Sequence, residues 1–272
     1  MELSINDSEY YPIQIPFLLN ENFKRNVSYS ETVCPDMAGF AICFWEMEPK
    51  TNPNQTVENI ILPDTCVDLL VDAGEKVVGF AGMKKTEFHY PILAGSSSFG
   101  FRLKPGAFQC LTGLPAEKAM DGFIPLDDFD TGFSASKFFE LQPAEQKNVL
   151  REYLLALTGN KKPSKFMELY DILYADTPDN VSEICKMLNY SQKQCERLFN
   201  RHFGLTPKMI LSVLRFQNAL RILTSVHVKQ SDILRIEGYY DQPHLNKDVK
   251  QSIGLTPLEL IKACREDVDF IQ

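Results

Sequence analysis

The sequence predicts an α+β protein with two domains. An antiparallel β-rich, barrel-like N-terminal domain comes first, and an all-α domain follows in which a long helix joins two similar modules. Three observations lead to this prediction. Residues 38–108 alternate short apolar runs with turn residues, a helical pattern begins near residue 143, and Gly-Leu-Thr-Pro occurs at both 204–207 and 254–257. A chain of 272 residues has the usual length for two domains.

The N-terminal part is expected to be a compact antiparallel sheet or barrel. Turn signals such as Pro-Asn, Pro-Asp and Gly-Ser-Ser-Ser separate runs rich in β-branched and aromatic residues. The predicted strands are 39–47, 57–62, 66–71, 77–83, 88–93 and 99–103. Trp45, Phe40 and Phe44 are expected in the core, and Cys66 and Cys110 are expected to be small buried side chains.

A helical pattern covers residues 143–157, and another at 165–174 opens the second domain. Between them, the Gly-, Asn-, Lys-, Pro- and Ser-containing segment 158–164 has the composition of a flexible linker. We therefore place the N-terminal domain at residues 1–158 and the helical domain at residues 165–268.

The helical domain contains a duplication. Around the repeated Gly-Leu-Thr-Pro, residues that lie 50 positions apart agree in type, with apolar residues matching apolar and basic matching basic. The matched pairs are Tyr190 with Tyr240, Gln192 with Gln242, Arg197 with Lys247, Phe199 with Val249, and Phe203 with Ile253. Two copies are too few for a solenoid, so the pattern indicates two small helical modules side by side.

The first module has the pattern of a helix-turn-helix. Residues 181–188 place apolar side chains on one helical stripe, and Asn189 interrupts it with a residue that tolerates a left-handed turn. Ser191 and Gln194 then have the spacing of a capping box, so a second helix begins there. That helix ends at Gly204. Two short helices joined by a short turn make a helix-turn-helix.

The second module repeats this plan. Residues 232–237 form its first helix, Asp241 caps its second, and Pro243 lies in the first turn, where a missing N–H does little harm. Between the modules, Thr206 as N-cap and Pro207 as first helical residue start a helix that runs to about Leu223. A helix of about 17 residues at about 1.5 Å each is a rod of about 26 Å.

The outward faces of the two second helices carry long cationic and amide side chains, which can contact base edges and phosphates from a major groove. The candidate DNA-binding residues are Gln192, Lys193, Glu196, Arg197, Asn200, Arg201, Gln242, His244, Asn246, Lys247 and Lys250. Lys193 and Arg197 are the expected base contacts, with Glu196 able to accept from a cytosine amine. Asn200, Arg201 and Lys250 are expected on phosphates. The alternative is a solvated helix face without a ligand, and for His244 an ordinary surface histidine.

Residues of about 165–265 resemble the DNA-binding domain of the AraC/XylS family of bacterial transcription regulators. In the second module the resemblance is carried by Ile233-Leu234, Gly238-Tyr239, Lys247, Lys250 and Gly254-x-Thr256-Pro257, and in the first by Ser191, Cys195, Arg197 and Phe199. The family usually has Ala at Cys185 and Leu234, Phe at Leu245 and Val249, and Ser at Pro243. These departures put base contacts by the second module in doubt, and it is expected to bind more weakly or mainly to phosphate.

Residues of about 10–130 are similar to an uncharacterised, sensor-like domain found ahead of AraC-type modules. The similarity rests on Leu62-Pro63-Asp64, Asp68-Leu69-Leu70 and the segment 99–107, with Thr65 where Gly is common. It implies a domain that senses a small-molecule effector or a partner and forms a homodimer. Asp64, Asp68 and Arg102 are candidate effector-binding residues; the alternative is that they satisfy turns and strand ends.

Charge divides unevenly between the two parts. Residues 181–272 hold 13 Lys+Arg and 10 Asp+Glu, a net of +3, which leaves 28 − 13 = 15 and 36 − 10 = 26, a net of −11, for residues 1–180. The acidic part is expected to face away from DNA, the double-stranded partner of the basic part. Seven scattered cysteines without a Cys-x-x-Cys favour a reducing compartment. With no signal-peptide pattern and no membrane partner expected, we predict a cytoplasmic protein.

Two other classes of protein are alternatives to a transcription regulator. A metal-dependent β-barrel enzyme needs two or three histidines with a carboxylate, and residues 1–180 contain only His89. No nucleophile elbow, zinc-protease motif or phosphate loop occurs, so we expect no catalytic residues, no metal and no cofactor. A protein-interaction adaptor with degenerate helix-turn-helix modules is the remaining alternative, because the second module departs from the family pattern.

Overall fold

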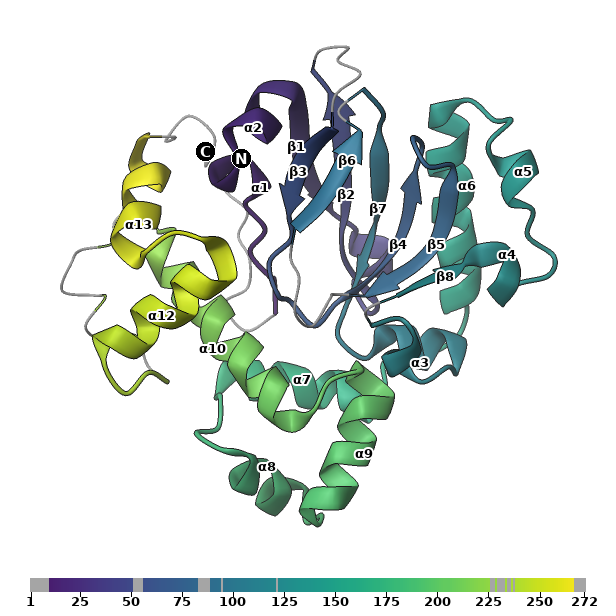
Figure 1. Cartoon of the computed structure of the whole chain (residues 1–272). Helices are drawn as coiled ribbons and strands as arrows, with labels where there is room; N and C mark the ends of the chain where they lie inside the picture. Colours follow the sequence, from purple (N-terminus) through teal and green to yellow (C-terminus); the bar gives the residue numbers. More distant parts are fainter. Residues whose placement is uncertain are drawn as a thin grey trace.

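The structure is a computed structural model that describes residues 10–50, 56–82, 89–93, 95–120, 122–225, 228, 233, 236 and 238–266. A sheet-containing N-terminal part is flanked on one side by the C-terminal helices, which extend along it from α7 to α13 (Figure 1).

The N-terminal part is built from two antiparallel sheets, which confirms the predicted β-rich class. The larger has the order β1-β2-β7-β4-β5-β8, and the smaller pairs β3 with β6. The strands are β1 (Val27–Val33), β2 (Ala41–Pro49), β3 (Thr56–Ile60), β4 (Val67–Asp72), β5 (Val77–Gly82), β6 (His89–Leu93), β7 (Ser98–Leu103) and β8 (Phe123–Pro125). All six predicted strands are present. Met83 and Phe88, which were predicted at strand ends, lie outside the described residues.

Two strands of the larger sheet were missed, and both lie at its edges. β1 carries Ser, Glu and Thr among its apolar residues, so it lacks a clear apolar alternation, and polar residues are common on edge strands. β8 is three residues long, too short for a periodic signal. The central strand β7 is buried along its whole length.

The core of the sheet contains the expected aromatic residues. Trp45 and Phe40 are buried, and the half-buried Phe44 packs against the core. Cys66 is buried as predicted, but Cys110 is only half-buried, because it lies on the short helix α3 (Ala107–Thr112) with its thiol toward Lys162. The alternating strands thus place large apolar groups on the inner face.

Short helices fill the ends of the sheet. They are α1 (Pro16–Leu19), α2 (Glu21–Asn26), η1 (Pro35–Met37), α3, η2 (Ala116–Lys118), α4 (Leu126–Phe129) and α5 (Ala135–Phe138). The longer α6 (Pro143–Thr158) confirms the helix predicted at 143–157 and begins with a capping box of Gln142 and Glu145. It is held on the sheet by Lys147, whose ammonium lies 2.5 Å from Glu46 and 3.0 Å from Glu48 of β2.

The helices predicted from 165 to about 223 and the start predicted at Asp241 agree with the structure, and α13 was not predicted. The C-terminal helices are α7 (Lys165–Ala175), α8 (Val181–Leu188), α9 (Gln192–Phe203), α10 (Pro207–Leu223), α12 (Gln242–Ile253) and α13 (Pro257–Glu266). Ser191 and Gln194 form the expected capping box. Thr206 and Asp241 cap α10 and α12 through their side chains. Asn189, Gly204 and Gly254 are left-handed.

The first helix of the second module was predicted at 232–237, and most of that segment lies outside the described residues. Two of its apolar side chains, Ile233 and Ile236, are buried with Leu245, Val249 and Ile253 of α12 in one cluster. The burial of Leu245, Val249 and Ile253 agrees with the apolar pattern of α12, and the burial of Ile233 and Ile236 is added by the structure.

The hydrophobic packing does not stop at the segment 158–164. One cluster of buried residues runs from the sheet through α3 and η2 into α7, α8, α9 and the start of α10. Within it, Tyr10 packs edge-on against Tyr170 at 4.9 Å between ring centroids. Lys161 of the segment also donates to the carbonyl oxygens of Leu111 and Leu157, both at 2.9 Å. The first module and the N-terminal part therefore share a core.

The two equivalent glycines that end α9 and α12 differ in what surrounds them. Gly204 has φ 73°, and a Cβ there would lie 2.4 Å from Cγ of Met120 and 3.0 Å from the backbone of Ala116. Gly254 has φ 77° and nothing within 4 Å of the same position. Both need the left-handed conformation, but only Gly204 lies against the N-terminal part.

This difference gives a matched pair of variants. Gly254→Ala should cost about 1 kcal/mol, the left-handed cost alone. Gly204→Ala should cost about 1–3 kcal/mol more, because the new methyl overlaps Met120 and Ala116. Urea unfolding of both variants measures the difference. Equal losses would show that the end of α9 is not packed against η2.

Candidate nucleic-acid interface and the polar network behind it

Helix α9 presents the predicted candidate residues to solvent. Its capping box fixes the first turn, and Cys195, Phe199 and Phe203 are buried on the opposite side. The exposed side chains are Gln192, Lys193, Glu196, Arg197 and Arg201. Gln192 donates to Glu196 at 3.2 Å. Asn200 is half-buried instead of fully exposed, because it lies near the C-terminal end of α9, which packs against the rest of the protein. The rest of the predicted face is free to meet a ligand.

Helix α12 shows the same division. Leu245, Val249 and Ile253 are buried, while the predicted Gln242, His244, Asn246, Lys247 and Lys250 are exposed. Two contacts that the sequence did not predict join α12 to the turn before it. The Tyr239 hydroxyl donates to Asp248 at 2.7 Å, and its ring lies edge-on to His244 at 5.2 Å.

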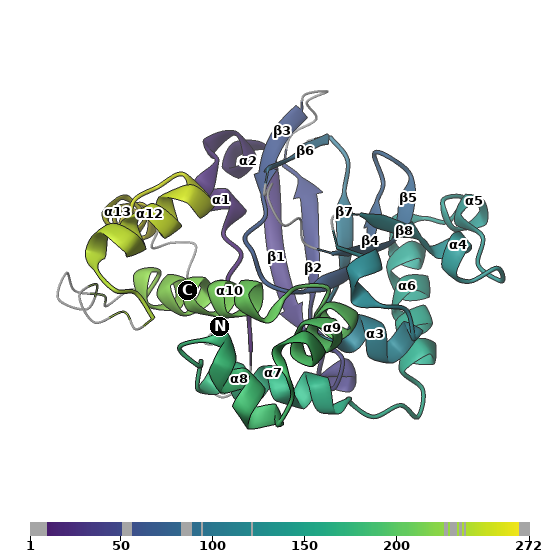
Figure 2. The same cartoon turned by 60° about the horizontal axis from the view of Figure 1, so that its bottom comes forward.

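Helix α10 separates these two faces. In both views, α9 lies near one end of α10, and α12 and α13 lie near the other (Figure 1, Figure 2). The 17 residues of α10 bury apolar side chains along its length, from Ile210 to Leu223. A regular helix of this length is a stiff spacer, so the distance between the two exposed faces is set by α10.

His202 lies on the buried side of α9 and is not a DNA-facing residue. Its ring stacks on Phe166 of α7 at 3.7 Å between centroids. Burial, aided by the nearby Arg201, lowers the pKa of His202 to about 4. The imidazole is therefore neutral at pH 7 and serves as a flat packing group between α7 and α9.

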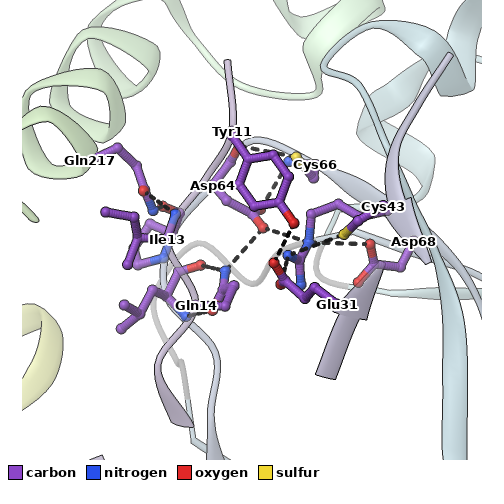
Figure 3. A network of polar contacts seen from close by, with 12 residues as sticks. Tyr11, Ile13, Gln14, Glu31, Cys43, Asp64, Cys66, Asp68 and Gln217 are labelled. Carbon is purple, nitrogen blue, oxygen red and sulfur yellow. Dashed lines mark hydrogen bonds and ion pairs between the residues drawn. The ribbon is translucent and has the colours of Figure 1, made fainter. Parts of the chain in front are cut away.

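The candidate effector-binding residues Asp64, Asp68 and Arg102 lie together in the N-terminal part. Figure 3 shows Asp64 and Asp68 within this polar network. Arg102 is buried, and its Nη1 lies 2.6 Å from Glu31. Its Nε lies 3.5 Å from Asp64 and 3.7 Å from Asp68. The three residues thus pair with one another, as expected if they satisfy the fold. A small-molecule effector at this place stays a hypothesis.

One arginine facing three carboxylates leaves an excess of negative charge in a buried place. Burial raises the pKa of Asp68 to about 7, and Arg102 opposes that rise while Asp64 and Glu31 add to it. Burial also raises the pKa of Asp64, against Arg102 and hydrogen bonds from Cys66 and Gln14. Near neutral pH the cluster can therefore hold a proton on Asp68, which reduces the repulsion.

The cluster is joined to helix α10 by a chain of buried amides. Gln14 donates to Asp64 at 3.0 Å and to the Leu62 carbonyl at 2.8 Å, and its oxygen accepts from the Leu62 N–H. On the other side, Gln217 of α10 accepts from the Ile13 N–H at 2.8 Å and donates to the Pro63 carbonyl at 2.7 Å. Figure 3 shows Gln217 beside Ile13.

Sequence reasoning missed most of this network. Tyr11, Gln14, Tyr29 and Glu31 lie before the first predicted strand and carry no motif. Gln217 had a detectable signal, because it is a polar residue on the stripe between Leu214 and Leu220 of a helix that is otherwise apolar there. A buried amide at such a position requires partners from another element.

The described part of the chain contains no group of three or more metal-ligating side chains. None of its helices is long and apolar enough to cross a membrane.

Comparisons with known proteins agree with the geometry of the helical modules. Residues 184–263 match a helix-turn-helix domain family. The chain carries an AraC-type helix-turn-helix domain. Residues 32–125 match a second family, a domain of unknown function (DUF6597), within the range where the sensor-like resemblance was noted. The AraC-type domain thus includes both α9 and α12.

Two curated relatives also match part of the chain. The HTH-type transcriptional regulator GbdR of Pseudomonas aeruginosa, from two strains, is 24% identical over 103 residues, which is 37% of this chain and 28% of GbdR. The chain therefore spans little more than a quarter of the length of the curated relatives that it matches.

Solved structures of ToxT from Vibrio cholerae are similar at low level. One is 11% identical with a TM-score of 0.38, covering 87% of this chain and 97% of ToxT. Another, of ToxT with a bound unsaturated fatty acid, has a TM-score of 0.36 and is 11% identical, covering 87% of this chain and 93% of ToxT. This likeness is too low to support a statement about ligands.

The raised pKa of Asp68 predicts a pH dependence of stability. The carboxyl ordinarily has a pKa of 3.8, and in the folded protein its pKa is about 7. Between about pH 4 and pH 7 the folded state thus holds more protons, so stability should fall as pH rises through this window. Asp68→Asn should make that fall smaller, with the rest due to the raised pKa of Asp64, and it should melt higher than wild type at pH 8. Melting temperatures from pH 5 to 8 measure it.

Asp36→Asn is the control, because Asp36 lies at the surface in an ion pair with Arg151. It should leave the pH slope of wild type unchanged. Parallel curves for wild type and Asp68→Asn would contradict the shifted pKa of Asp68.

Gln217→Ala should destabilise the protein by about 2–4 kcal/mol, because it leaves the Ile13 N–H and the Pro63 carbonyl without partners. Asn218→Ala is a matched control, since among the described residues the Asn218 side chain bonds to Thr177, within the helical part, at 3.3 Å. It should cost about 1 kcal/mol. Hydrogen exchange of the Ile13 amide adds a local readout. Unchanged protection of that amide in Gln217→Ala would show that Gln217 does not hold the segment.

Proposed function

We propose that this protein is a sequence-specific DNA-binding transcription regulator of the AraC type. One observation carries the proposal. The capped helices α9 and α12 lie near the two ends of the stiff α10, and each has an exposed face of cationic and amide side chains. Two such elements separated by a rod can enter successive major grooves on one side of a duplex.

The individual contacts form part of the proposal. Lys193 and Arg197 contact base edges, and Glu196 accepts from a cytosine amine. Arg201, Lys250 and the half-buried Asn200 hold the register on phosphates. Of these positions, Arg197 lies in the middle of the exposed face of α9, between the buried Cys195 and Phe199. It is therefore the side chain best placed to reach the floor of a groove.

The N-terminal part acts as the controlling element, bound by a small molecule or a partner. Two features support this role: the core shared with the first module, and Gln217, which ties α10 to residues 13 and 63. A change in the N-terminal part therefore alters the free energy of holding α10 in place. The proposal also includes homodimerisation through the N-terminal part, as in the family. It places the protein in the bacterial cytoplasm, where DNA is accessible.

The experiment is selection of bound duplexes from randomised DNA with the full chain. We expect a motif of two short blocks about ten base pairs apart, one helical turn. Full-length protein is needed because part of the core of the helical domain is formed by the N-terminal part. Failure to enrich any motif would contradict the proposal.

Two arginines of α9 should then separate base contacts from phosphate contacts. Arg197→Ala should cost about 1–3 kcal/mol on the selected site and relax preference at one base position. Arg201→Ala should weaken binding to all sequences alike. Gel-shift titrations on the selected site and on single-base variants distinguish the two. If Arg197→Ala changes neither affinity nor preference, Arg197 does not contact a base.

A further inference from the structure

Two cysteines lie on either side of the turn in the first helix-turn-helix module. Cys185 of α8 precedes the left-handed Asn189 by one helical turn, and its carbonyl accepts from the Tyr190 N–H at 3.0 Å. Cys195 of α9 follows the N-cap Ser191 by one helical turn, and its N–H donates to the Ser191 carbonyl at 3.0 Å. The two cysteines are therefore at equivalent distances from the point where the helices meet.

The thiols of these cysteines lie next to each other, where α8 and α9 are in contact (Figure 1). Ile184, which precedes Cys185, and Phe199, one turn after Cys195, are both fully buried in the same core. Burial, and next the interaction with the Cys185 thiol, raises the pKa of Cys195 to about 12. Both cysteines are free thiols in this structure, so a pair of reduced sulfurs joins the two helices.

The two thiols differ in their access to solvent. Cys195 is 0% exposed, whereas Cys185 is half-buried and lines a surface hollow of about 410 Å³. The other residues that line the hollow are polar: Ser182, Lys186, Asn189, Tyr190 and Ser191. A small polar reagent can therefore reach Cys185 but not Cys195. An accessible thiol with a second thiol behind it is the arrangement found at reversible oxidation sites.

Packing of a helix-turn-helix module does not require this pair. At position 185 the AraC/XylS family usually has Ala, which fills the same place without a sulfur. In the second module of this chain, Leu245 is the match of Cys195 at the offset of 50, and it is buried in α12 as Cys195 is in α9. The same type of module is thus built without a thiol at this position.

We propose that Cys185 and Cys195 form a reversible disulfide on exposure to a hydroperoxide, and that the disulfide form binds DNA more weakly than the dithiol form. The effect on DNA rests on the proposed function, whereas the formation of the disulfide does not. In a reducing compartment a disulfide of this kind is transient and reports the presence of an oxidant.

The reaction has two steps. The thiolate of Cys185 attacks an oxygen of the hydroperoxide, the O–O bond breaks, and the departing alkoxide takes the proton that Cys185 lost, which leaves a sulfenic acid on Cys185. The Cys195 thiol then attacks that sulfur, and the S–O bond breaks as the S–S bond forms. The hydroxyl leaves with the Cys195 proton as water. The two thiols lose two electrons, which reduce the peroxide, and a dithiol reductant restores them by exchange.

A covalent bond between the sulfurs requires α8 and α9 to move closer at this point, because the packed interface has no slack to absorb the change. The far end of α9 is held in place, since Phe203 is buried and packs on Tyr170 of α7 at 5.5 Å between ring centroids. The movement therefore falls on the first turns of α9, which carry Lys193 and Arg197. Loss of one base contact there weakens specific binding about 10- to 100-fold.

The test compares full-length protein before and after treatment with hydrogen peroxide. Peptide mapping by mass spectrometry, after alkylation of the remaining thiols, should show residues 185 and 195 joined by a disulfide. Gel-shift titration on the selected duplex should show binding weakened about 10- to 100-fold, and dithiothreitol should restore it. Cys185→Ala should bind as reduced wild type does, and peroxide should not change its affinity.

Cys110→Ala is the matched control. Cys110 is also half-buried, but its thiol is directed at the Lys162 carbonyl, at 3.5 Å, and not at a second cysteine. This variant should keep both the disulfide and the loss of binding. Cys195→Ala gives a second readout that does not depend on DNA. With the second thiol removed, peroxide should leave a sulfenic acid on Cys185, which dimedone traps and mass spectrometry detects.

The outcomes separate this inference from the proposed function. If wild type selects a motif but peroxide joins no peptides at residues 185 and 195, the thiol pair is wrong and the proposed function stands. If the disulfide forms and affinity for the selected duplex does not change, the control of DNA binding is overturned. If reduced wild type selects no motif, the proposed function fails and the effect on DNA fails with it, while the joined peptides would still support the thiol pair.

Discussion

The structure depends on the burial of α10 and of the inner side of α9 against the N-terminal part. Apolar residues supply most of this contact, but it contains backbone groups that need partners, and Gln217 supplies two of them at once. A buried N–H or carbonyl left without a hydrogen bond costs free energy comparable to a lost bond. This requirement makes the contact specific, because only one placing of α10 satisfies both groups.

The two modules are held in different ways. The first is continuous with the N-terminal core, through Phe203, Met167 and Tyr170 around α3 and η2. The second packs on α10 and on apolar residues such as Ile15, Ile60 and Leu62. Its core uses Leu245 and Val249 where the AraC/XylS family usually has larger aromatic residues. The hydrogen bond from Tyr239 to Asp248 additionally fixes α12 to the turn before it. A structural change in the N-terminal part would therefore affect the first and second modules through different contacts.

Charged residues are also distributed differently in the N-terminal part and in the helical part. The acidic N-terminal part holds a buried group of charges, in which Arg102 faces Glu31, Asp64 and Asp68. Removing one member of a buried ion cluster leaves an uncompensated charge, which is why such clusters fix geometry even when they add little net stability. The exposed faces of α9 and α12 carry Lys193, Arg197, Arg201, Lys247 and Lys250, where a polyanion can reach them.

The sequence alone determined the helical domain almost completely. Capping residues, left-handed glycines and apolar stripes are local signals, and they act within one turn of the residues that carry them. Ser191, Thr206, Gly204 and Asp241 therefore fixed α9, α10 and α12 to within a residue, and with them most of the exposed candidate face. The central strands were equally visible, since their period of two and their turn residues are local as well.

Tertiary structure decided what depends on distant parts of the chain. The edge strands β1 and β8 exist because neighbours supply their hydrogen bonds, not because their own residues demand it. Arg102 meets Glu31 across 71 positions, and Gln217 meets Ile13 across 204. No pattern within a segment encodes such a pair, because the energy of a buried charge or amide is set by whichever partner the fold delivers. The half-burial of Asn200 has the same origin, since the end of α9 that carries it is covered by η2.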